Sequence, residues 1–153
     1  MIGMGHSVES CPFCNGHLRS VSEEQEIRIG RRSARVLDQF FRCAACEEAF
    51  YAPGQMDATL RRASEAIRHE EGLMSPQEIR GIRERLGLTQ HAFEKLLGVG
   101  PKTVVRWEKG TVYQNRSTDS LLRVVDALPE SAQFLARLHG VTLPDHPQIA
   151  VQQ

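Results

Sequence analysis

The chain has 153 residues, of which 41% are hydrophobic and 25% charged, a composition that allows one or two small globular domains. Its net charge is zero, although residues 73–140 hold ten Lys or Arg against seven Asp or Glu. Neither a leading apolar run nor a span of about eighteen apolar residues is present, so we expect no secretion signal, no membrane segment and a cytoplasmic location, where thiols stay reduced.

All four cysteines occur in two CxxC pairs, Cys11/Cys14 and Cys43/Cys46, with 28 residues between the pairs. A CxxC turn brings two sulfurs to one side, so two such turns complete a tetrahedral four-thiolate zinc site. A disulfide framework requires an oxidising compartment, and a redox CxxC normally occurs singly within a βαβ unit. We therefore predict one structural Zn²⁺ per chain, with no open coordination position and no catalysis.

The segment between the pairs predicts a zinc-ribbon hairpin. Residues 26–29 alternate apolar and polar side chains, residues 30–33 suit a turn, and residues 36–42 return as an apolar strand. So small a core needs metal binding to supply much of its folding free energy, on the order of 10–16 kcal/mol for such sites. The turn is basic, and it is either a partner-binding surface or a solvated tip; its arginines are Arg28, Arg31, Arg32 and Arg35.

An amphipathic helix follows Pro53, because Met56, Leu60, Ala63 and Ile67 recur at helical spacing. We assign residues 1–72 to a zinc-ribbon-like domain that ends with this connector helix. The next domain, residues 73–140, is expected to contain five short helices. Residues 141–153 hold two prolines and little to bury, so we expect a loosely ordered tail.

The first, fourth and fifth helices of that second domain have clear start or stop signals. Ser75 to Glu78 forms a capping box with proline at the first helical position, and Gly87 ends this helix. Ser117 or Thr118 is expected to cap the fourth helix. Pro129 is expected to open the fifth, which Gly140 ends. The last two helices carry more apolar positions than one small core needs, and the surplus is either a dimer face or further core.

Residues 88–110 predict two helices joined by a tight turn. Thr89 suits the N-cap of the first helix, and Gly98 interrupts its apolar pattern. Pro101 suits the first position of the second helix, which Gly110 ends as a left-handed cap. This is the helix-turn-helix arrangement, whose second helix enters the DNA major groove.

The second of these helices separates apolar from basic residues. Val104 and Trp107 should face the core, and the cations share the opposite stripe, which suits phosphates and guanine edges. Gln90, at the start of the preceding helix, can hydrogen-bond the DNA backbone. The predicted DNA-binding residues are Gln90, Lys102, Thr103, Arg106 and Lys109.

The same stretch resembles the Xre, or lambda-repressor-like, helix-turn-helix family, whose LTQ…LGV…T(I/V)xRWExG pattern is matched almost throughout residues 88–110. Five short helices agree with that fold in number and order. The expected fold class is therefore mainly α with a small β zinc ribbon. An N-terminal four-cysteine zinc domain precedes a C-terminal five-helix lambda-repressor-like domain.

The whole combination resembles the MqsA-type zinc-finger antitoxins over about residues 11–139. The resemblance rests on CPxC, on CxxCEE and on the closing RWEKG. It implies an antitoxin of a type II toxin–antitoxin system, whose zinc domain inhibits a toxin, typically an mRNA-cleaving ribonuclease. It also implies a second domain that forms a homodimer and represses transcription at a palindromic operator. The family's base-contacting arginine falls on Arg106, whereas its asparagine falls on Lys102, so base preference there stays open.

Two other classes of protein share features with this sequence. The first is a zinc-ribbon Xre-family transcriptional regulator without a toxin partner. The second is an enzyme that uses CxxC redox chemistry, which the paired cysteine spacing disfavours. HExxH and GxSxG motifs are absent from the sequence, so we expect no catalytic residues and no enzyme activity.

Overall fold

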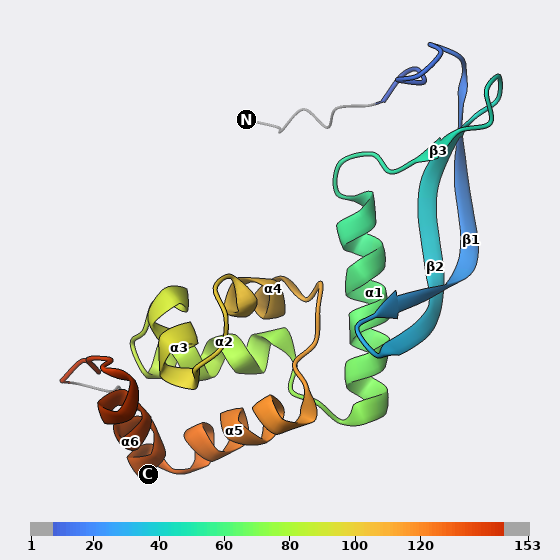
Figure 1. Ribbon diagram of the computed structural model, residues 1–153. Helices are drawn as coiled ribbons and strands as arrows, with labels where there is room; N and C mark the ends of the chain where they lie inside the picture. The colour runs from blue at the N-terminus through green and yellow to red at the C-terminus, as the bar shows by residue number, and fades with distance from the viewer. Residues whose placement is uncertain (1–7, 146–153) are drawn as a thin grey trace, which may run out of the picture. The chain divides into compact units, whose positions relative to one another are not determined.

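A computed structural model describes residues 8–145, which form two compact units that divide after Ile67. The elements are β1 (Leu18–Ile29), β2 (Arg32–Cys43), β3 (Ala49–Phe50), α1 (Gln55–Glu71), α2 (Pro76–Arg85), α3 (Gln90–Leu97), α4 (Thr103–Lys109), α5 (Arg116–Ala127) and α6 (Pro129–His139) (Figure 1). The expected fold class, mainly α with a small β ribbon, is confirmed. The units divide inside α1, whereas the sequence placed the domain boundary after this helix, at Gly72.

The first unit is built on a long antiparallel hairpin in a three-stranded sheet of order β1-β2-β3. Its register runs from Leu18 opposite Cys43 to Ile29 opposite Arg32, so both strands are longer than predicted. The extra length of β1 is not evident from the sequence because the first half of this strand is mostly polar. Pairing with the more apolar β2 keeps it extended. Gly30 turns the chain at a φ of 62°, which glycine adopts without a steric penalty.

Helix α1 is held to β2 by polar contacts, of which the bond between Thr59 and Asp38 is buried. Asp38 of β2 is buried and accepts hydrogen bonds from the Tyr51 hydroxyl and the Thr59 hydroxyl, both at 2.8 Å. Burial, with Asp38 beside the phenol, raises the pKa of Tyr51. One turn further on, Arg62 donates to the Leu37 carbonyl at 3.1 Å. These contacts place α1 along the hairpin that ends in the second cysteine pair (Figure 1).

The apolar stripe predicted for α1 is correct at Ala63 and Ile67, which are buried, but wrong at Met56, which is 52% exposed. Contact with β2 begins one turn after Met56, and there the buried position belongs to Thr59 because its hydroxyl bonds Asp38. A polar residue thus replaces the expected apolar one at the start of the contact.

The second unit encloses one aliphatic core with two aromatic side chains. Five helices surround it, in the number and order expected. The buried cluster contains Met74, Ile79, Ile82, Leu88, Phe93, Leu96, Leu97, Val104, Trp107, Leu122, Val125, Ala132 and Ala136. Because α3 and α4 both contribute to this cluster, the helix-turn-helix is packed into the core of the unit.

The predicted ends of α2 and α6 agree with the structure, whereas the predicted start of α5 does not. The capping box of Ser75 and Glu78 is present, and Pro129 opens α6. Helix α5 begins at Arg116, and its N-cap is Asn115 rather than Ser117 or Thr118. The Asn115 amide oxygen accepts the backbone N–H three residues on, at 2.8 Å, which places both predicted caps inside the first turn.

The first part of the predicted tail is packed against the helical unit. Val141 and Leu143 are partly buried beside the core cluster. A Cβ on Gly87 would lie 2.9 Å from the Pro144 ring, so this proline covers the turn after α2. The expectation of loose order from residue 141 therefore differs from the structure up to Pro144, and residues 146–153 lie outside the described residues.

The buried carboxylate of Asp119 connects the start of the helical unit to α5. It accepts hydrogen bonds from the Met74 N–H at 2.8 Å, the Gln114 amide at 2.9 Å and the Arg123 guanidinium at 2.8 Å. Desolvation acts to raise the pKa of Asp119, but the Arg123, Met74 and Gln114 donors outweigh it and hold the pKa below its usual value.

A depressed pKa stabilises the fold at pH values above the unfolded-state pKa, and this stability is lost as the pH falls through the folded-state value. We expect Asp119→Asn to lower the free energy of unfolding by about 1–3 kcal/mol at pH 7, because its amide cannot accept all three bonds. Denaturant titrations of both proteins at pH 7 and pH 3 measure this. The deficit should shrink at pH 3, and a deficit independent of pH would contradict the assignment.

Candidate metal centre and nucleic-acid interface

Each cysteine pair lies in a tight backbone turn, here called a knuckle: residues 11–16 and residues 43–48. Both knuckles are closed by the same two backbone hydrogen bonds. In the first knuckle, Asn15 N–H donates to Cys11 O at 2.9 Å and Cys11 N–H donates to Gly16 O at 3.0 Å. In the second, Glu47 N–H donates to Cys43 O at 3.1 Å and Cys43 N–H donates to Glu48 O at 3.0 Å. The residue after the second cysteine is left-handed in both, with φ of 60° and 63°. The two halves of the site therefore share one local design.

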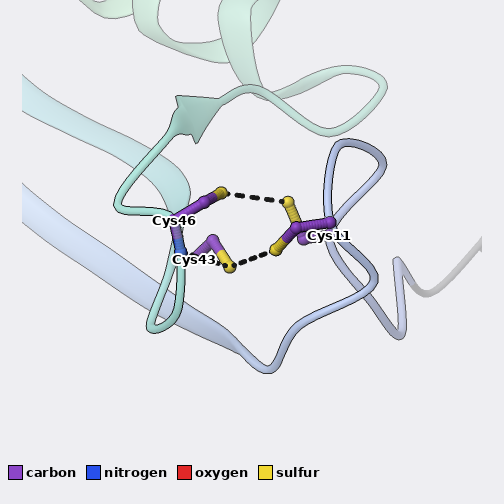
Figure 2. A group of neighbouring side chains, drawn as sticks. Cys11, Cys43 and Cys46 are labelled. Carbon is purple, nitrogen blue, oxygen red and sulfur yellow. Dashed lines mark hydrogen bonds between the residues drawn. The ribbon is translucent and has the colours of Figure 1, made fainter.

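The four sulfurs converge. All four Sγ atoms lie within 4.8 Å of one another, with Cys11 and Cys46 3.7 Å apart and Cys14 and Cys43 3.4 Å apart (Figure 2). A tetrahedral ion with Zn–S bonds of about 2.3 Å places its sulfurs about 3.8 Å apart. The predicted ligands are thus together and can hold a metal ion. Within residues 8–145 they are the one such group of Cys, His, Asp or Glu.

The thiols differ in acidity because the backbone donors are unevenly placed. The N–H groups of Cys46 and Ala45 point at the Cys43 sulfur and lower the pKa of Cys43 to about 6. The Glu48 N–H acts to lower the pKa of Cys46, but desolvation and the neighbouring Cys14 and Cys43 thiols raise it to about 12. Four thiolates this close repel one another, and a bound divalent cation offsets that repulsion. A closed, all-sulfur set fits a structural metal.

Gly16 is a further residue of this site, and it was not among those predicted from the sequence. A Cβ there would lie 2.9 Å from the Cys43 sulfur, 3.0 Å from the Ala45 Cβ and 3.1 Å from the Cys14 sulfur. Any larger residue would therefore push into the metal ligands. The sequence shows only a glycine two positions after a CxxC pair. That a side chain would not fit there depends on the position of the opposite knuckle.

Glu47 carries backbone strain that glycine would remove, because a left-handed residue with a Cβ costs roughly 1–2 kcal/mol. We expect Glu47→Gly to raise the free energy of unfolding of the metal-loaded ribbon by about 0.5–1 kcal/mol, since glycine's larger unfolded-state entropy takes back part of the gain. Denaturant midpoints measure it. Asn15→Gly, at the matching position, is the control and should gain less, because asparagine tolerates this conformation. A destabilised Glu47→Gly protein would refute the explanation.

The helix-turn-helix has the predicted caps but a different start to its second helix. The Thr89 hydroxyl caps α3, and Gly98 ends it at a φ of 71°. Pro101 is not the first residue of α4, as predicted, because α4 begins at Thr103 and Lys102 precedes it at a φ of 65°. The buried carboxylate of Glu94 on α3 accepts the Lys102 N–H at 3.1 Å, which keeps both residues in the turn.

The faces of α4 are divided as predicted. Val104 and Trp107 are buried in the core. The cations Lys102, Arg106 and Lys109 are exposed, and Thr103 is half-buried. Lys102 directly precedes the helix rather than belonging to it. The structure therefore presents a basic surface made by α4 and the turn before it.

Gln90, the remaining predicted DNA contact, is hydrogen-bonded to the buried carboxylate of Glu108. It is half-buried at the first position of α3, and its side-chain nitrogen donates to the Glu108 carboxylate. Glu108 also accepts from Arg83 of α2 at 2.7 Å. Neither Glu108 nor Arg83 was among the predicted site residues. The signal in the sequence was an acid within the basic recognition helix.

These two units define a class of protein: a four-cysteine metal ribbon joined to a lambda-repressor-like helix-turn-helix domain. Comparison with known families narrows the class. The family described as "Antitoxin component of bacterial toxin-antitoxin system, MqsA" matches residues 9–135, and the chain belongs to this family. The chain is also 34% identical to Antitoxin MqsA of Escherichia coli (strain K12), over 124 residues that cover 78% of this chain and 94% of that protein.

A second relative is Antitoxin HigA-2 of Vibrio cholerae serotype O1 (strain ATCC 39315 / El Tor Inaba N16961). It is 34% identical over 65 residues, which cover 42% of this chain and 62% of that protein. Family membership confirms the resemblance found in the motifs and supports an antitoxin role, in a regulatory family rather than an enzyme family. No helix among residues 8–145 is long and apolar enough to cross a membrane.

Proposed function

We propose that this chain is the antitoxin of a type II toxin–antitoxin system. Its zinc-bearing ribbon unit neutralises a protein toxin, and its helical unit represses transcription by binding palindromic operator DNA, both in the cytoplasm. The observation that carries the proposal is that one chain of an antitoxin family holds a closed four-sulfur site and a helix-turn-helix with an outward basic surface. The family supports this over the regulator without a toxin.

The exposed cations of α4 suit distinct parts of DNA. The planar fork of Arg106 can bond O6 and N7 of one guanine together. Lys102 stands at the start of the helix, where base edges are met, and Lys109 near its end is placed for phosphate. Thr103 and Gln90 supply further hydrogen bonds to the backbone.

Arg106→Ala is expected to cost about 1–3 kcal/mol on the operator and to flatten preference at one base pair, because a bidentate contact is lost. Lys109→Ala should weaken binding to all DNA similarly and lower the salt slope by about one. Titrations on operator and scrambled DNA at several salt concentrations compare them. Equal losses of affinity on both DNAs for Arg106→Ala would mean that this arginine contacts only phosphates and does not recognise a base.

The toxin-binding half of the proposal is tested by co-purification. The full-length protein, tagged and expressed in its native host, should retain a small protein, and the resemblance implies an mRNA-cleaving ribonuclease. Arg106→Ala should retain the same protein, whereas Cys43→Ser should lose it, because the ribbon unit carries the contact. Retention by Cys43→Ser would place toxin binding on the helical unit. Elemental analysis of the purified protein identifies the metal, for which we propose one zinc per chain.

We further propose that the helical unit forms a homodimer through an apolar surface on α5 and α6, here called the α5–α6 face. Its members are Val124, Leu128, Phe134 and Leu138, which are 44%, 53%, 58% and 61% exposed. A palindrome requires two-fold related recognition helices about 34 Å apart. The exposed apolar residues on α5, on α6 and between them can pack against the same residues of a second copy of the chain.

A further inference from the structure

One carboxylate lies between three helices of the DNA-binding unit. The Glu108 side chain is 1% exposed and forms a two-point pair with Arg83, at 2.7 Å from Nε and 3.4 Å from Nη2. Arg83 also donates from Nη1 to the Leu88 carbonyl, at 3.0 Å. These bonds fix the position of the carboxylate relative to the start of α3, where Gln90 is found.

The remaining bond of this cluster determines how the Gln90 amide is oriented. A carboxylate paired with an arginine only accepts hydrogen bonds, so it selects the amide nitrogen of Gln90 and turns the amide oxygen away. The Nε2 atom carries two hydrogens. Glu108 takes one, and no acceptor for the second is found among residues 8–145, so this hydrogen can meet an acceptor outside the protein.

We propose that Glu108 is a positioning residue for DNA binding, which holds the Gln90 amide with its second N–H directed outward to a phosphate oxygen. Arg83 supports it by fixing the carboxylate. This inference rests on the proposed DNA binding and assigns a role to the acid inside a basic recognition helix. Backbone N–H groups and glutamine side chains commonly donate hydrogen bonds to DNA phosphates. These contacts fix the register and orientation of a protein on the duplex.

Glu108→Gln is expected to weaken DNA binding, although it removes a negative charge. Removing a negative charge near DNA should by Coulomb attraction strengthen binding. Arg83, however, must bond the oxygen of the new amide, which turns the new NH₂ group toward Gln90. The Gln90 amide then reverses and presents its oxygen to the phosphate. We expect about tenfold weaker binding to operator and to scrambled DNA alike, the scale of one hydrogen bond to a charged group.

A double-mutant cycle separates positioning from a structural role. Gln90→Ala should also weaken binding about tenfold, and the double variant should be no weaker than either single one, because both remove the same contact. Glu84→Gln, on the exposed part of α2, controls for the change in charge and should bind at least as well as wild type. Losses that multiply to about a hundredfold in the double variant would overturn the proposal. If wild type itself bound neither DNA, the proposed function would fail instead.

A measurement on the unmodified protein covers the case in which Glu108→Gln does not fold. The side-chain NH₂ resonances of Gln90, identified by their absence in Gln90→Ala, should show one hydrogen protected from exchange in free protein. Adding operator DNA should then protect the second. Two equally exposed hydrogens in free protein, or no change on adding DNA, would overturn the positioning role.

Discussion

Removing the metal is expected to unfold the ribbon unit while the helical unit stays folded. Among the described residues of the first unit, the buried apolar side chains apart from Cys11 and Cys43 are Phe40, Ala63 and Ile67, too few to hold a long hairpin alone. Structural zinc contributes on the order of 10–16 kcal/mol in such sites. The core cluster of the helical unit contains no cysteine. Cys43→Ser or chelation should therefore abolish the β signal in circular dichroism and leave one cooperative helical transition.

A milder variant distinguishes metal binding from loss of a buried thiol. Gly16→Ala keeps all four ligands but drives a methyl group against two of the sulfurs, so it should lower zinc affinity and ease unfolding by chelator. Gly100→Ala is the control, because its new methyl would lie 3.7 Å from the Thr103 hydroxyl, an ordinary contact. A ribbon that stays folded in Cys43→Ser without metal would contradict the structural role of the site.

Breaking the α5–α6 face is expected to have the largest effect on operator binding. Phe134→Glu with Leu138→Glu places two charges on the proposed contact, which should yield monomers. Each half-site would then be bound alone, and the loss of effective concentration weakens binding to the palindrome by about 10²–10⁴-fold. Sedimentation gives the oligomeric state, and titration of full and half operators gives the affinity. Binding to an isolated half-site should change little.

Met56→Glu is the matched control for this experiment. Met56 is also an exposed apolar residue, at 52%, but it lies on α1 in the first unit. Its substitution should leave both the dimer and operator affinity unchanged. A charged α5–α6 face that still forms dimers would show that another surface joins the two copies.

The sequence by itself determined the features that depend on near neighbours along the chain. CxxC spacing identified the four cysteines whose sulfurs meet in one cluster, because two residues between cysteines suffice to form a knuckle. The capping box at Ser75 and the division of α4 between core and basic face follow from spacings of three and four residues. These contacts are made within one turn of chain, so no knowledge of the fold is needed to recognise them.

The tertiary structure alone decided the features that join distant positions. Glu108 meets Arg83 and Gln90 across 25 and 18 positions, and Gly16 leaves room for a sulfur of the opposite knuckle. Lys102 lies in the turn before α4 because Glu94 of another helix takes its N–H. The physical reason is the same in each case. A hydrogen bond or a steric limit between separate elements depends on how those elements pack, and local spacing along the chain contains no information about it.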